Sequence, residues 1–224
     1  MLIHSDFIKS IPKEVKLVAV SKTQSCETIQ QAYDAGLRIF GENKPQELVK
    51  KYNALPKDIE WHFIGHLQTN KVKYIVPFVE LIHSVDSLKL LDEINKEAAK
   101  CNRQIKCLLQ VHIADEETKF GFTVSELFKS ALEFIYFKKN LKYDFVKIAG
   151  LMGMATYSSD ETKIRNEFRK LRQVFDILKG TVFAENPDFC QLSMGMSNDY
   201  KIAISEGSTI IRIGSLIFGE RNYN

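Results

Sequence analysis

The chain has 224 residues, of which 45% are hydrophobic, and its 31 basic and 28 acidic side chains give a formal net charge of +3. That length supports a sizeable core, and the mixed, nearly balanced charge indicates neither a nucleic-acid nor a membrane partner. Residues 1–16, "MLIHSDFIKSIPKEVK", contain no long apolar run and include an early aspartate, so we expect neither a signal peptide nor a membrane anchor.

Short apolar runs alternate with amphipathic stretches along the whole chain. The apolar runs predict strands over residues 15–22, 37–43, 61–66, 80–87, 106–114, 146–155, 190–196 and 209–219. The stretches between them predict helices over 26–36, from Pro45, from about Thr69 to Pro77, and over 88–100, 125–137, 160–178 and 198–207. Gly36 suits a helix C-cap, and Pro45 suits a first helical turn.

Eight β/α units in a little over 200 residues are typical of a single (β/α)8 TIM-type barrel. The nearly continuous apolar strands fit a parallel sheet that is covered on both faces. A doubly wound open sheet also accommodates eight strands, so the periodicity favours the barrel without excluding that alternative. No linker rich in proline, glycine or serine divides the chain, and we therefore expect one domain over residues 1–224.

Polar residues gather at the predicted carboxyl ends of the strands, where barrels of this type carry their chemistry. Lys22 ends the first strand, Asn43 ends the second, and Arg212 lies inside the last apolar strand, two residues before Gly214. Any single one of these polar residues could equally be the first solvated residue of a loop. That interpretation does not account for Arg212.

The loops after the seventh and eighth strands are where this fold often binds phosphate. In the first loop, Gly195 allows close approach of the backbone and Ser197 supplies a hydroxyl, and in the second loop Gly214 and Ser215 have the same uses. Neither GxxxxGK[ST] nor GxGxxG occurs in the chain. The sequence therefore predicts a barrel phosphate site and not a nucleotide in a P-loop.

Lys22 is predicted to face this phosphate site across the mouth of the barrel. Partial burial favours a neutral amine, and a neutral amine forms Schiff bases with aldehydes. The ligand that combines an aldehyde, a ring and a phosphate is pyridoxal 5′-phosphate, for which Arg212 is the predicted partner of the pyridine nitrogen. A permanent cation there disfavours protonation of that nitrogen and weakens the ring as an electron sink.

The sequence resembles the pyridoxal phosphate homeostasis proteins, which are single-domain relatives of the N-terminal barrel of bacterial alanine racemase. The matching stretches follow the family's order: "LVAVSKTQ", "DAGLRIFGENKPQE", "WHFIGHLQTNK", "HSVDS", "GLMGMA" and "LSMGMSNDYKIAISEGSTIIRIGSLIFGER". They extend from about Val15 to Arg221. The usual members carry a longer helix before the first strand than the roughly fourteen residues present here.

This resemblance implies the (β/α)8 barrel, pyridoxal 5′-phosphate as the cofactor, and Lys22 as the lysine that forms the Schiff base. It implies that Asn43 lies beside the cofactor ring and that Arg212 faces the pyridine nitrogen. It also implies the residues that bind the phosphate, which are Ser197, Gly214 and Ser215.

Two functions fit these residues. The first is a monomeric, non-enzymatic protein that takes part in intracellular pyridoxal 5′-phosphate homeostasis and delivers the cofactor to apo-enzymes. The alternative is a pyridoxal-phosphate-dependent amino-acid racemase, which needs two acid/base groups on opposite faces of the substrate α-carbon. Lys22 serves one face, but in alanine racemase a tyrosine from a second domain and the partner subunit serves the other. The sequence shows no such domain, and none of its eight tyrosines lies in a motif that would identify it as this second base. We therefore favour a protein that binds the cofactor over an enzyme that converts amino acids.

The other reactive side chains receive ordinary interpretations. His62 and His66 lie about 13 Å apart if they share a strand, which is too far for one zinc ion, so we expect no metal site. His62 either lines the cofactor pocket or packs in its strand, and Lys119 is interpreted as a solvated loop lysine. We expect barrel packing for Met152, Met154, Met194 and Met196. Reduced thiols in the cytoplasm are expected for Cys26, Cys101, Cys107 and Cys190.

Overall fold

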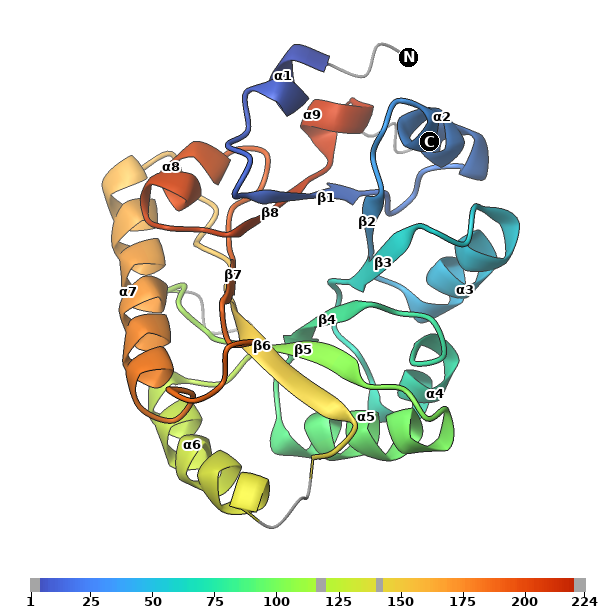
Figure 1. Cartoon of the computed structure of the whole chain (residues 1–224). Coiled ribbons are helices and arrows are strands. Elements are labelled where there is room, and N and C mark those ends of the chain that lie inside the picture. The colour runs from blue at the N-terminus through green and yellow to red at the C-terminus, as the bar shows by residue number, and fades with distance from the viewer. Residues whose placement is uncertain (1–4, 116–119, 140–142, 220–224) are drawn as a thin grey trace.

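The computed structural model describes residues 5–115, 120–139 and 143–219. These residues form a closed barrel of eight parallel strands in chain order, surrounded by helices (Figure 1). The strands are β1 (Lys16–Val20), β2 (Ile39–Glu42), β3 (Glu60–Phe63), β4 (Leu81–Val85), β5 (Ile105–Gln110), β6 (Val146–Met152), β7 (Gln191–Ser193) and β8 (Ile210–Ile213). The predicted (β/α)8 barrel is therefore confirmed, and the open sheet is excluded.

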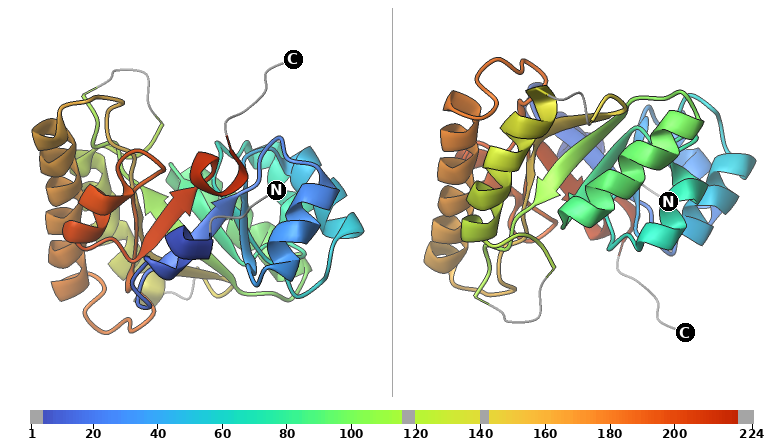
Figure 2. Two further views of the ribbon diagram at one scale, coloured as in Figure 1. Left: turned by 90° about the horizontal axis from the view of Figure 1, so that it is seen from above. Right: turned by 90° about the horizontal axis from the view of Figure 1, so that it is seen from below.

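Helices lie between successive strands as the alternation predicted, and a further short helix before the first strand was not predicted. The helices are α1 (Ser5–Lys9), α2 (Cys26–Asp34), α3 (Pro45–Ala54), the 3₁₀ helix η1 (Thr69–Lys71), α4 (Val72–Ile75), α5 (Leu88–Lys100), α6 (Val124–Lys139), α7 (Glu161–Gly180), α8 (Tyr200–Ser205) and α9 (Ser215–Phe218). Figure 2 shows α7 on the side of the barrel opposite to α2 and α3. None of the described helices has the length and apolarity that a membrane crossing needs.

Local chemistry explains where several helices begin and end. The side chains of Ser25, Ser87 and Asp160 accept hydrogen bonds from the first-turn amides of α2, α5 and α7. Pro45 occupies the first turn of α3, where its missing N–H costs nothing. Gly36 follows α2 with φ +102°, a left-handed conformation that favours glycine.

The last predicted strand is wrong in its second half. β8 ends at Ile213, and the apolar run "SLIF" forms the helical turn α9 instead of more strand. Gly214 begins this turn, because its carbonyl accepts the amides of Ile217 and Phe218. A short apolar run satisfies both strand and helix patterns, and only the closing of the barrel at β8 distinguished them.

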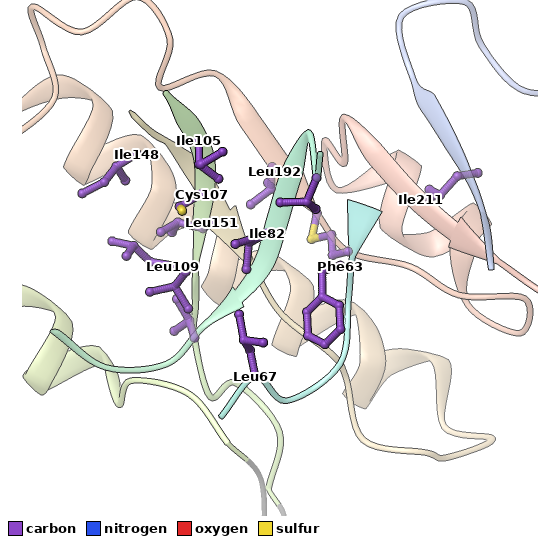
Figure 3. Close-up of a cluster of buried hydrophobic side chains, with 14 of the residues drawn as sticks. Phe63, Leu67, Ile82, Ile105, Cys107, Leu109, Ile148, Leu151, Leu192 and Ile211 are labelled. Carbon is purple, nitrogen blue, oxygen red and sulfur yellow. The ribbon is translucent and has the colours of Figure 1, made fainter. Parts of the chain in front are cut away.

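Side chains of the strands alternate between the two faces of the barrel wall. Outward-facing side chains pack against the helices in one large cluster, and Figure 3 shows part of it, including Ile82, Leu109, Leu151, Leu192 and Ile211. A smaller apolar cluster fills the interior and contains Val18, Leu81, Leu108, Ala149, Met152 and Ile210. Arg212 pairs in register with Val18, so its guanidinium belongs to the interior face.

Candidate functional site

All of the predicted site residues lie at one end of the barrel. Lys22 lies two residues after the end of β1, Asn43 follows β2 directly, and both are half-buried. Ser197 lies in the loop after β7, and Gly214 and Ser215 follow β8. Because the strands are parallel, their carboxyl ends form a single rim, and the structure brings these residues to that rim together with Arg212.

Lys22 lies in a tight turn immediately after β1. The amide of Gln24 donates to the carbonyl of Ser21 at 3.0 Å, and this bond closes the turn around Lys22. Thr23 has φ +68°, a left-handed conformation that costs a residue other than glycine on the order of 1 kcal/mol. The surrounding structure must therefore hold this turn in place.

A buried cluster of charges lies against the turn. The Lys51 ammonium of α3 donates to the Ser21 carbonyl at 2.8 Å, to Glu42 Oε1 at 2.8 Å and to Glu47 Oε1 at 2.6 Å. Glu47 Oε1 also accepts the amide of Thr23 at 2.8 Å, and Glu42 Oε1 accepts the Ser21 hydroxyl at 2.5 Å. Lys51 is only 4% exposed and Glu42 is fully buried.

The pKa values of the two carboxyl groups in this cluster shift in opposite directions. Burial raises the pKa of Glu42 above its usual value, although the charge and hydrogen bond of Lys51 oppose that rise. Partial burial also acts to raise the pKa of Glu47, but hydrogen bonds from Lys51 and the Thr23 amide outweigh it and lower that pKa. The sequence alone did not single out Glu47 or Lys51, although their i,i+4 spacing was visible.

Arg212 holds its positive charge inside the barrel with neutral hydrogen-bond partners. Its Nη1 donates to Ser193 Oγ at 2.6 Å and its Nη2 donates to the Gly153 carbonyl at 3.1 Å. Burial lowers the pKa of Arg212 to about 10, while the nearby Asp199 acts to raise it. The guanidinium thus remains charged at neutral pH and has further N–H groups for an acceptor at the mouth.

Two buried histidines continue the polar chain away from Arg212. Ser193 Oγ lies 2.9 Å from His83 Nδ1, and His83 Nε2 lies 3.0 Å from His62 Nδ1. Arg212 only donates, so Ser193 Oγ accepts from it, and the bonds among Ser193, His83 and His62 take their direction from the tautomer of His83. Burial lowers the pKa of His62 to about 3, with help from the charges of Lys16 and Lys106, and lowers the pKa of His83 well below its usual value.

His62 is therefore a packed strand histidine and belongs to the barrel interior. The described residues contain no group of three or more histidine, cysteine, aspartate or glutamate side chains that could hold a metal ion. His66 lies at the rim, where its Nδ1 is 3.1 Å from Asp86 Oδ2 and its ring stacks on Phe120 at 4.0 Å.

The loop after β7 begins against β8, because the amide of Arg212 donates to the Gly195 carbonyl at 2.9 Å. Asp199 shapes this loop by accepting the amide of Met196, and Gly195 has φ +98°. Within the described ranges, no protein acceptor is recorded for four amides of the loops after β7 and β8, those of Ser197, Asn198, Ser215 and Leu216. Neighbouring unsatisfied amides of this kind fit a phosphate group.

The backbone of Asn43 is fixed by a close approach to the next strand. A Cβ atom added at Gly65 would collide with the main chain of Asn43, so only glycine fits there. The hydroxyl of Ser84 donates to the Gly65 carbonyl and holds that contact from β4. The "GEN" and "FIGH" stretches thus depend on each other.

The remaining predictions have mixed outcomes. Met152 and Met194 are buried and Met154 packs against the interior cluster, as expected, but Met196 is exposed in the loop after β7 and does not pack in the barrel. The prediction was wrong there because β7 ends at Ser193, and Met196 lies in the loop that follows. The four cysteines form no disulfide, and Lys119 lies outside the described residues.

Comparisons with known proteins agree over nearly the whole chain. The sequence profile of the alanine racemase N-terminal domain matches residues 6–222. The pyridoxal phosphate homeostasis protein of Aquifex aeolicus is 46% identical over 212 residues, which cover 93% of this chain and 88% of that protein. The homologue of the same name from Synechocystis is 37% identical over 221 residues, which cover 98% and 97%.

Solved structures show the same relationship. PipY of Synechococcus elongatus with PLP bound superposes with a TM-score of 0.84 at 32% identity, covering 96% of this chain and 97% of that one. An alanine racemase of Clostridium difficile has a TM-score of 0.73 at 12% identity, covering 98% of this chain and 55% of that one. At such low identity the racemase shows likeness of fold alone.

Proposed function

This chain belongs to the pyridoxal phosphate homeostasis protein family, and from that premise we propose that it binds pyridoxal 5′-phosphate as a Schiff base on Lys22. The observation that carries the proposal is the arrangement of the rim. A half-buried lysine held in a hydrogen-bonded turn and a set of unsatisfied amides occupy the same end of one barrel. An amine and an anion site are what an aldehyde with a phosphate requires.

Each predicted residue has a distinct use in this proposal. The amides and hydroxyls at Ser197 and Ser215, with Gly214 between β8 and α9, would hold the phosphate. Asn43 would lie beside the ring. Arg212 would face the pyridine nitrogen, and its charge at neutral pH would keep that nitrogen unprotonated. When bound, the cofactor supplies an aldehyde that an amine can capture.

We propose that the chain holds and releases the cofactor and does not turn over amino acids. The relatives carry the name of homeostasis proteins, and a cation at the pyridine nitrogen weakens the ring as an electron sink. In this proposal the protein is a cytoplasmic monomer that passes its cofactor to apo-enzymes. The racemase alternative stays open, because Lys22 could serve as one of the two bases that racemisation needs.

Borohydride reduction followed by peptide mass analysis tests the Schiff base. We expect the label on the peptide that contains Lys22 and its loss, with the imine absorbance, in Lys22→Ala. Lys44→Ala is a matched control, because Lys44 is an exposed lysine next to Asn43 at the same rim and should keep the label on Lys22. A label on another lysine, or none, would refute the proposal.

Two further measurements separate the carrier from the racemase. Mixing the loaded protein with an apo-enzyme should activate that enzyme faster than the same concentration of free cofactor does. Interconversion of L- and D-alanine that scales with protein and disappears in Lys22→Ala would instead establish the racemase. Light scattering at several concentrations tests the monomer.

A further inference from the structure

The turn that contains Lys22 is held from both sides by one pair of residues on α3. Lys51 binds the carbonyl of Ser21, the residue before Lys22, and Glu47 binds the amide of Thr23, the residue after it. Glu47 and Lys51 are one helical turn apart and are ion-paired to each other at 2.6 Å. The main chain is therefore clamped immediately before and immediately after Lys22.

Burial makes this clamp stiffer than a surface ion pair. The ammonium of Lys51 has three N–H bonds, and the three acceptors within reach, Ser21 O, Glu42 Oε1 and Glu47 Oε1, use all of them. Exposed pairs gain little because their long side chains move freely in water, whereas Lys51 is 4% exposed. The clamp also stabilises Thr23 in its left-handed conformation, which the turn requires.

We propose that Glu47 and Lys51 are positioning residues for Lys22, which set where its amine meets the aldehyde of pyridoxal 5′-phosphate. The inference rests on the proposed Schiff base. In that reaction the amine nitrogen forms a C=N bond with the aldehyde carbon, and the aldehyde oxygen leaves as water. Its rate depends on the approach of two atoms, and misplacement by about 1 Å can slow such a step a hundredfold. Neither Glu47 nor Lys51 needs to touch the cofactor for this effect.

The experiment compares covalent capture with simple binding. Imine formation from pyridoxal 5′-phosphate is followed by stopped-flow absorbance. Binding of pyridoxine 5′-phosphate, which has the same ring and phosphate but an alcohol in place of the aldehyde, is followed by calorimetry. For Glu47→Ala we expect imine formation to slow by about tenfold or more, while the affinity for the alcohol changes by less than about threefold. A residue that only supports the fold would weaken both.

Two variants serve as rescue and control. Glu47→Gln keeps an oxygen that accepts the Thr23 amide and should restore the rate to within about threefold of the wild type. Asp176→Ala breaks another i,i+4 ion pair, to Arg172 at 2.8 Å on α7, and should leave rate and affinity unchanged. Urea unfolding of each variant shows whether it is folded under the assay conditions. If Glu47→Ala does not fold, Glu47→Asp, whose shorter side chain cannot span the same distance, takes its place.

The outcomes distinguish this inference from the proposed function. If the wild type forms no imine, the proposed Schiff base is wrong. If the wild type forms the imine and Glu47→Ala forms it at the same rate, the positioning role is wrong while the Schiff base stands. Equal loss of imine formation and of alcohol binding would also overturn the positioning role, because it would assign Glu47 to the fold alone.

Discussion

Acid should destabilise this barrel through the histidines that it buries. The pKa of His62 is lowered from about 6.5 to about 3 by burial, so the folded state binds fewer protons than the unfolded state between these values. A histidine whose pKa is lower in the folded state than in the unfolded state contributes its full stabilisation above pH 6.5, and this stabilisation is lost as the pH falls toward 3. The loss is about 1.4 kcal/mol per pH unit for each such histidine.

The size of this loss of stability depends on how far the pH lies below the pKa of the unfolded state. At pH 5, which is 1.5 units below 6.5, His62 alone should remove about 2 kcal/mol from the free energy of unfolding. His83 shifts in the same direction and adds to the loss. The loss of about 2 kcal/mol from His62 alone is a substantial part of the 5–15 kcal/mol that is typical of a domain.

Urea unfolding at half-unit steps from pH 7.5 to 4.5 measures this slope. In His62→Asn, the side-chain amide has both an acceptor and a donor for His83 Nε2, but the group no longer titrates, so the slope should fall by about 1.4 kcal/mol per pH unit. His66→Asn removes a histidine at the exposed rim and is the matched control. Parallel slopes for the wild type and His62→Asn would refute the reasoning.

Three further outcomes follow from the geometry. Lys51→Met should cost about 3–5 kcal/mol in urea unfolding, because it leaves Glu42 buried without its cation, and a loss below about 1 kcal/mol would contradict this. Gly195→Ala should lower thermal stability and weaken binding of pyridoxine 5′-phosphate, because Gly195 has φ +98° and an added Cβ would lie 2.6 Å from the Cβ of Ala203. An unchanged melting temperature and an unchanged affinity for this ligand would argue against that reasoning. Burial raises the pKa of the Cys107 thiol, so a disulfide reagent should modify exposed Cys101 within minutes and leave Cys107 intact until the protein unfolds.

Some residues of the site were predictable from the sequence and others were not. Lys22, Asn43 and Ser197 were predicted because each one is a polar residue where an apolar run ends, and the structure places all three at the rim. Glu47 and His83 were missed for a different reason. A glutamate on a charged helix and a histidine in an apolar strand both have common surface or packing explanations, and no local pattern shows which partner they meet.

The amino-acid sequence by itself determined the alternation of strands and helices, several helix ends and the residues at the rim, because periodicity, capping and strand ends are local properties. Only the tertiary structure decided that α9 replaces the end of the last strand, and that Lys51 reaches back 30 residues to the Ser21 carbonyl. The same holds for the bond between His83 and Ser193, which are 110 residues apart. Such contacts need the folded chain, since α3 must pack beside the end of β1 and the closed barrel must bring β4 and β7 to face each other.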